Sequence, residues 1–110
     1  TNIIYLNGYV CKPPVYRLTP LGKSITDLII AVNRSDGRND YIPCITWKKT
    51  AEAASNLIVS DRIELYGRIQ SREYSKKVYF EDEYSKENHM INEVSVIRLR
   101  KITSGKNSTC

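Results

Sequence analysis

Aromatic and cationic side chains occur close together in two stretches of this 110-residue chain. The stretch 40–48 carries Tyr41 and Trp47 six positions apart, and Lys48 and Lys49 follow the tryptophan. Flat aromatic rings stack on nucleobases, at about 1–3 kcal/mol per base, while nearby cations contact the phosphates. Residues of these two types on one surface predict binding of a single-stranded nucleic acid.

The stretch 62–74 reads as a β-strand with one unusual face. Successive side chains of a strand point to opposite sides. The aliphatic side is predicted to be core and consists of Ile63, Leu65, Gly67 and Ile69. The other side interleaves aromatics with guanidinium groups and consists of Glu64, Tyr66, Arg68, Gln70, Arg72 and Tyr74. A solvated face ordinarily carries Lys, Glu and Thr, so the second side is predicted to bind a ligand.

The same alternation divides the strand predicted over 40–48. The inner face is assigned to Ile42, Cys44 and Thr46, and the outer face to Tyr41, Pro43, Ile45 and Trp47. Strand register slips easily, because a shift of one residue exchanges the two faces. Alternation alone therefore leaves open that Tyr41 and Trp47 pack in the core or in a subunit interface.

The predicted elements follow the order three strands, one short helix, two strands. The strands are expected over 2–11, 24–34, 40–48, 62–74 and 92–102, with Thr50 capping a helix over 51–58. This order is that of the OB-fold, an all-β, five-stranded Greek-key barrel with the helix between strands 3 and 4. Gly8 and Gly67 would mark bends that let the barrel close. An open α+β sheet with the helix on one face is the alternative.

Domain organisation and compartment follow from length and composition. The OB-fold domain is predicted over 1–102 and a flexible tail over 103–110, with a long hairpin loop around the acidic residues 81–83. The net charge of +5 is compatible with a polyanionic partner. No apolar run reaches the length of a membrane span and no signal peptide is visible. The three cysteines form no C-x-x-C pair, which predicts free thiols in a cytoplasmic protein.

Catalytic, metal and cofactor sites are not predicted. Gly22-Lys23-Ser24 imitates the end of a phosphate-binding loop, but Arg17 stands where the pattern needs glycine and a strand follows. The adjacent acids 81–83 have no converging ligands. His89, the single histidine, has no visible nucleophilic partner. The chain is therefore predicted not to be an enzyme.

Several segments together resemble the bacterial single-stranded DNA-binding protein family. They are Asn2 to Gly8 (N-x-x-x-L-x-G), 17–22 (RLTPLG), 31–34 (AVNR), 40–52 (DYIPCITWKKTAE), 67–72 (GRIQSR) and Glu93-Val94. The resemblance covers about residues 2–102. It implies an OB-fold, a homotetramer, and sequence-independent binding of single-stranded DNA by base stacking.

The resemblance also places the binding residues. The family's stacking aromatics match Tyr41, Trp47 and Tyr74, whereas Asp36 stands where many members have a further aromatic. Taken together, the predicted DNA contacts are Arg34, Tyr41, Trp47, Lys48, Lys49, Tyr66, Arg68, Arg72 and Tyr74. The departure at Asp36 affects the expected footprint and affinity.

The predicted function is protection of single-stranded DNA in replication, recombination or repair, in the bacterial cytoplasm at the nucleoid. The expected partners are single-stranded DNA and further copies of the chain, as a homotetramer or dimer. Many family members end in an acidic tip that recruits other proteins, and this sequence ends at Cys110 without one. It thus matches a short paralogue, a truncated form, or the related primosomal replication protein. A primosome-type adaptor and an RNA-binding OB module are the alternative functions.

Overall fold

The computed structural model describes residues 1–80 and 83–104, where strands predominate. In chain order the elements are β1 (Ile4–Val10), β2 (Val15–Leu18), β3 (Ser24–Asn33), β4 (Asn39–Trp47), α1 (Lys48–Ser55), β5 (Arg62–Phe80) and β6 (Glu83–Thr103). They form one sheet in the order β1-β5-β6-β4-β3-β2.

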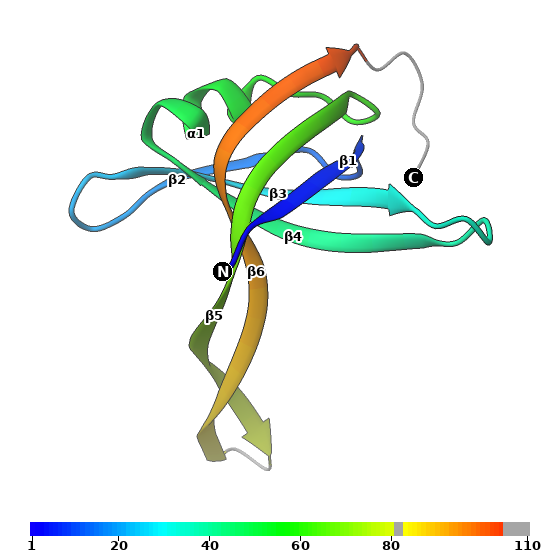
Figure 1. Cartoon of the computed structure of the whole chain (residues 1–110). Helices are drawn as coiled ribbons and strands as arrows, with labels where there is room; N and C mark the ends of the chain where they lie inside the picture. Colours follow the sequence, from blue (N-terminus) through cyan, green and yellow to red (C-terminus); the bar gives the residue numbers. More distant parts are fainter. Residues whose placement is uncertain (81–82, 105–110) are drawn as a thin grey trace.

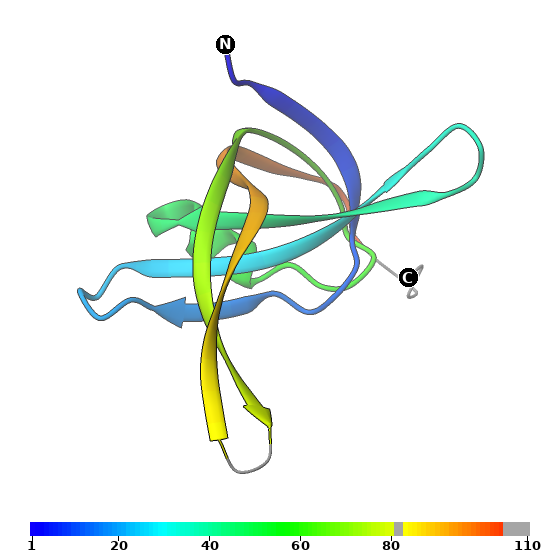
Figure 2. The same ribbon diagram turned by 90° about the horizontal axis from the view of Figure 1, so that it is seen from below.

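Two pairings close this sheet into a barrel (Figures 1 and 2). β1 pairs with β5 on one side and, at Tyr9 and Val10, with β3 on the other. β4 and β6 run parallel where Cys44 meets Val94. The predicted OB-fold barrel is confirmed, and the open α+β sheet is excluded, because β1, at one end of the strand order, also pairs with β3 near the other end and closes the sheet into a ring.

The β5–β6 hairpin projects from the barrel as a long twisted ribbon (Figure 1). The antiparallel register continues to Phe80 opposite Glu83. The prediction of a loop between about 75 and 91 was therefore wrong. Polar cross-strand pairs support the ribbon: Ser71 Oγ donates to Asn92 Oδ1 and Ser75 Oγ to Asn88 Oδ1. Of the acidic residues predicted to form the loop, 81 and 82 lie outside the described residues, as do 105–110 of the predicted tail.

Two further differences from the predicted elements concern β2 and α1. β2 was not predicted, although it has cross-strand partners in β3 along its whole length, from Val15 to Leu18. The helix begins at Lys48, not after a Thr50 cap, and Trp47 precedes it without a side-chain cap. Lys48 adopts a φ of 55°, a left-handed conformation that turns the chain sharply from β4 into α1.

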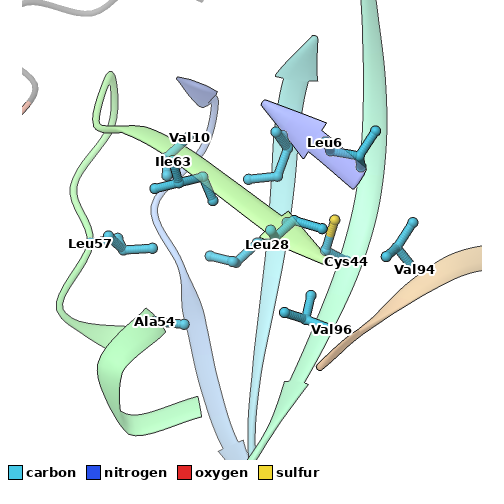
Figure 3. Packing of buried hydrophobic residues seen from close by; sticks show 11 residues of the cluster. Leu6, Val10, Leu28, Cys44, Ala54, Leu57, Ile63, Val94 and Val96 are labelled. Carbon is cyan, nitrogen blue, oxygen red and sulfur yellow. The ribbon is translucent and has the colours of Figure 1, made fainter. Parts of the chain in front are cut away.

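The core fills the barrel and confirms the predicted alternation at most positions (Figure 3). Leu65, Cys44 and Thr46 are buried, and Ile42 packs against the core cluster. Burial and the charge of Glu93 raise the pKa of the Cys44 thiol to about 12, so it stays protonated at neutral pH.

Two isoleucines differ from the predicted burial. Ile45 was assigned to the outer face but is buried, at a point where β4 is paired on both sides, with Asp27 of β3 and Ser95 of β6. Ile69 was assigned to the core but is 50% exposed. It lies beyond Gly67, on the part of β5 that leads into the projecting ribbon.

The predicted glycine bends coincide with points of close backbone approach. A Cβ on Gly8 would lie 2.4 Å from the carbonyl oxygen of Ala31, and one on Gly67 would lie 2.4 Å from that of Ser95. Both distances are far below van der Waals contact, so only glycine lets these strands pass. At Gly67 the β5–β6 register also shifts, as expected for a bulge in a closed barrel.

Candidate nucleic-acid interface

A hollow on the barrel, here called the groove, lies outside β3 and β4. It has a volume of about 590 Å³ and is bounded by the segment before β2 and by the base of the β5–β6 hairpin. Its lining is mainly apolar and includes Pro13, Val15, Ile29, Pro43 and Ile91. Lys12, Asp27, Arg72 and Glu93 contribute the charged groups. An apolar cleft with a few placed charges suits a flat organic ring carrying a phosphate.

A smaller hollow of about 290 Å³ adjoins the groove. Both are lined by Pro43 and Glu93, and the smaller one also contains Tyr41 and Ile69. Tyr41 is 58% exposed, so a face of its ring is accessible. The exposed Ile69 thus contributes an apolar side chain next to a predicted stacking residue. Together the two hollows form a concave track from β2 to Tyr41.

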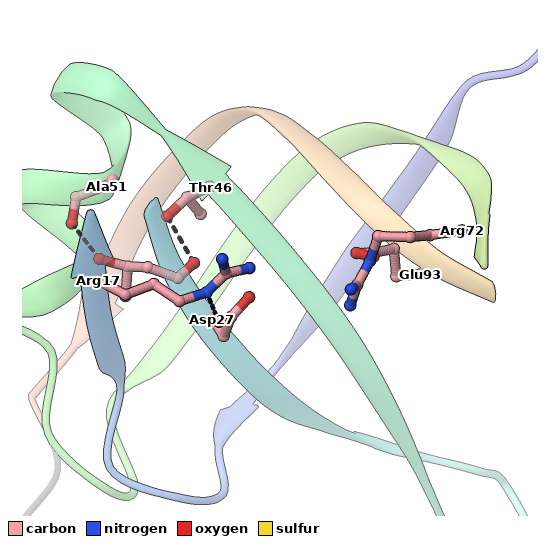
Figure 4. Close-up of polar contacts among 7 residues, drawn as sticks. Arg17, Asp27, Thr46, Ala51, Arg72 and Glu93 are labelled. Carbon is pink, nitrogen blue, oxygen red and sulfur yellow. Dashed lines mark hydrogen bonds and ion pairs between the residues drawn. The ribbon is translucent and has the colours of Figure 1, made fainter. Parts of the chain in front are cut away.

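Two ion pairs lie beside the groove (Figure 4). Arg72 Nε donates to Glu93 Oε1 at 2.7 Å, and Arg17 Nε donates to Asp27 Oδ2 at 2.8 Å. The hydrogen bond that Arg17 donates to Asp27 raises the pKa of Arg17, and the charge of Glu93 adds to the effect. The predicted contact Arg72 is therefore part of the groove wall, held against a carboxylate that was not predicted to take part.

Tyr74 stands on the projecting ribbon with one face covered. It is 43% exposed, and its ring stacks on that of His89 with centroids 5.4 Å apart and an interplanar angle of 24°. The two residues are direct cross-strand partners. His89 Nε2 also lies 3.1 Å from Glu87 Oε2. His89 thus covers one face of the Tyr74 ring.

The remaining predicted contacts on β4 and its flanks lie at the two ends of this strand. Trp47 is half-buried beside α1, and Lys48 and Lys49 are exposed in the first turn of the helix. At the opposite end, Arg34 Nε donates to Asp40 Oδ1 at 2.9 Å. This contact raises the pKa of Arg34 and lowers that of Asp40.

Tyr66 belongs to a different surface, and the predicted contact Arg68 lines neither the groove nor the smaller hollow beside it. Tyr66 packs against Tyr5 with ring centroids 4.9 Å apart. It lines a third hollow with Glu64, Ile97, Arg98 and Arg100, and this hollow shares no residue with the groove. We call this surface the β1–β5–β6 face. The structure therefore does not bring Tyr66 together with Tyr41 or Arg72, although alternation placed Tyr66 and Arg72 on one side of the same strand.

The structure adds groove residues that sequence reasoning missed. Lys12, Pro13 and Val15 come from the segment around β2, and Asp27, Ile29, Ile91 and Glu93 line the groove from β3 and β6. The signal for β2 was present as a short Val-Tyr-Arg-Leu run between two proline-containing turns. No local signal pairs Glu93 with Arg72, because the contact joins residues 21 positions apart.

Within residues 1–80 and 83–104, no group of three or more His, Cys, Asp and Glu side chains is arranged to hold a metal ion. Over the same part of the chain, no helix has the length and apolar character needed to cross a membrane.

Comparison with known proteins gives consistent results. The profile of the Single-strand binding protein family matches residues 1–97. Single-stranded DNA-binding protein 2 of Listeria innocua is 35% identical over 80 residues, covering 66% of this chain and 50% of that protein. Single-stranded DNA-binding protein A of Bacillus subtilis is 31% identical over 83 residues, covering 69% and 48%. The chain spans about half the length of these relatives.

A solved structure shares the fold. The wild-type single-stranded DNA binding protein from Thermus aquaticus aligns over 100% of this chain and 44% of its own, with a TM-score of 0.74 and 24% identity.

Proposed function

The chain belongs to the single-strand binding protein family, and we propose that it binds single-stranded DNA without regard to sequence and without enzymatic activity. The bases would stack on Tyr41, Trp47 and Tyr74 and enter the groove between them. The role we propose for it is protection of exposed single strands during replication, recombination or repair in the bacterial cytoplasm, at the nucleoid.

The observation that carries this proposal is the concave apolar track with Tyr41 at one end. Tyr41 and Trp47 lie six residues apart on β4, which corresponds to about 20 Å of extended strand. Pro43 lines the track between them. An extended nucleic acid laid along β4 would thus meet a ring at each end and an apolar wall between. Stacking requires only the flat faces of the bases, so such a track accepts any sequence.

Cations around the track supply the phosphate contacts of the proposal. Lys48 and Lys49 flank Trp47 at one end of β4. Arg72 faces the groove, and Arg34 lies near Tyr41 at the other end of the strand, bound to Asp40. Since Asp36 occupies the loop between β3 and β4, this loop adds no ring to the footprint.

We also propose that copies of the chain associate through the β1–β5–β6 face, as a dimer or homotetramer. Ile3 is 74% exposed beside this face, and Tyr5, Tyr66 and Ile97 expose further apolar surface on it. Large exposed apolar side chains in one patch are typical of protein interfaces. This role would use Tyr66 for self-association, leaving base stacking to the other three aromatics.

Titration of the protein with oligo-dT tests DNA binding directly. The fluorescence of Trp47, the single tryptophan, is expected to be quenched by oligo-dT and unaffected by a duplex of equal length. Unchanged emission at concentrations where a gel shift reports binding would show that Trp47 is not a stacking residue. Absence of both signals would refute the proposed function, and equal competition by oligo-U would favour an RNA-binding module.

A further inference from the structure

Glu93 is a nearly completely buried carboxylate in the wall of the groove. Its side chain is 3% exposed, whereas that of Arg72, its partner, is 46% exposed. The two side chains lie against each other (Figure 4), and the arginine is the partner that solvent reaches. The contact uses Nε of Arg72 and Oε1 of Glu93. Within the described residues, the two terminal amino groups of the guanidinium remain available to a ligand.

The burial of Glu93 is not explained by stability alone. Removing a carboxylate from water is costly, and a buried ion pair is often no more stabilising than apolar side chains of similar volume. The charge of Glu93 also acts on its surroundings, since it raises the pKa values of both Arg17 and Cys44. A charge kept at such a position, in contact with an exposed arginine that lines a binding groove, indicates a role in binding.

We propose that Glu93 is a positioning residue for DNA binding, which holds Arg72 with its terminal amino groups directed at the phosphate of a bound strand. This inference rests on the proposed function. A guanidinium offers five donors in a planar fork, and one edge matches the two oxygens of a phosphate. Fixing Nε on a buried carboxylate orients that fork before the ligand arrives, so less side-chain freedom is lost on binding.

Two variants of equal charge separate positioning from electrostatics. Glu93→Gln and Glu93→Ala both remove the negative charge, but only Gln retains an acceptor for Nε of Arg72. We expect Glu93→Ala to bind oligo-dT about five- to tenfold more weakly than Glu93→Gln. Its slope of log affinity against log salt is expected to be lower by about 0.7, one phosphate contact.

The same pair of variants in an Arg72→Ala background provides the control. If Glu93 acts through Arg72, the Gln and Ala variants at position 93 bind oligo-dT equally well in the Arg72→Ala background. The arginine that Gln could hold and Ala could not is then absent. If Glu93→Ala fails to fold, Glu93→Asp replaces it. This variant keeps the charge but withdraws the carboxylate by one methylene, and it is expected to lose the same phosphate contact.

The outcomes distinguish this inference from the proposed function. Absence of oligo-dT binding by the unmodified protein would refute the function itself. If the unmodified protein binds, and the Gln and Ala variants at position 93 have equal affinities and salt slopes, the inference about Glu93 is refuted and the proposed function stands. A difference between Gln and Ala that persists without Arg72 would also refute the inference, since Glu93 would then act by another route.

Discussion

The concave track, formed by the groove and the smaller hollow beside it, and the β1–β5–β6 face both expose tyrosine beside arginine. They differ in the chemistry of their lining and in how the tyrosines are used. Tyr41 borders a continuous apolar hollow, and a face of its ring is accessible. Tyr66 packs against Tyr5 at an interplanar angle of 51°. The Tyr5 ring is itself fixed in place, because its hydroxyl donates a hydrogen bond to Glu64 at 2.7 Å.

The charged groups differ in the same way. On the β1–β5–β6 face, Glu64 accepts from both Tyr5 and Arg100, so the rings and charges satisfy one another across the strands. At the groove, Glu93 binds Arg72 through Nε alone and leaves the rest of the guanidinium to a ligand. Residue type therefore does not identify a binding surface. The lining distinguishes the two: that of the groove is mainly apolar, whereas the hollow on the β1–β5–β6 face is lined mostly by charged and polar residues.

The largest expected effect concerns the core that both surfaces share. Leu65 is 1% exposed, so Leu65→Ala should lower the free energy of unfolding by about 2–5 kcal/mol. The affinity of the folded variant for oligo-dT should not change, because Leu65 faces away from the groove. Urea denaturation and a binding titration on the same sample measure the two quantities. Weaker oligo-dT binding by fully folded Leu65→Ala protein would mean that the substitution in the core alters the shape of the groove.

The next effect is expected from the three aromatics proposed to stack on bases. Tyr41→Ala and Tyr74→Ala should each weaken oligo-dT binding by about 1–3 kcal/mol. Their unfolding free energies should change by no more than about 0.5 kcal/mol, since both side chains are largely exposed. Trp47→Ala should show a similar loss of binding with a larger loss of stability, because Trp47 is half-buried. Variants that unfold but bind normally once folded would invert the assignment of strand faces.

A smaller effect is expected when the other surface is altered. Tyr66→Ala removes a ring pair, an interaction worth about 0.5–1.5 kcal/mol. We expect weaker self-association, measured by sedimentation at several concentrations, and unchanged affinity per chain for a short oligo-dT. Tyr41→Ala is the matched control, with the opposite pattern. If Tyr66→Ala loses affinity for oligo-dT while its oligomeric state is unchanged, Tyr66 is a DNA-binding residue after all.

The smallest effect is a pH dependence on the β1–β5–β6 face. Hydrogen bonds from Tyr5 and Arg100 lower the pKa of Glu64 below its usual 4.5. The folded state therefore favours the carboxylate, and its contribution to stability is present above the unfolded pKa and is lost as pH falls through the folded pKa. Glu64→Gln should accordingly be less stable than the unmodified protein at pH 7, and the difference should be smaller at pH 3, below the unfolded pKa. An undiminished difference at pH 3 would contradict this.

The local sequence pattern was sufficient to predict which side chains are buried in strands that have one face in the core and one in solvent. Alternation in 40–48 and 62–74 correctly placed Cys44, Thr46 and Leu65 inside and Tyr41 outside, because side-chain direction in a strand depends only on position along it. Glycine at positions 8 and 67 indicated where the barrel closes, since close backbone approach excludes any Cβ. The order of strands and helix was likewise sufficient for the OB-fold.

The tertiary structure alone decided which outward residues share a surface. Tyr66 and Arg72 point to the same side of β5, yet the strand twists and leaves the barrel between them, so they face different partners. Contacts such as Arg72 with Glu93 and Tyr5 with Tyr66 join residues far apart in the sequence. Such contacts depend on strand register and on the bulge at Gly67. Alternation is a local property with a period of two residues, whereas register and twist are set by closure of the whole barrel.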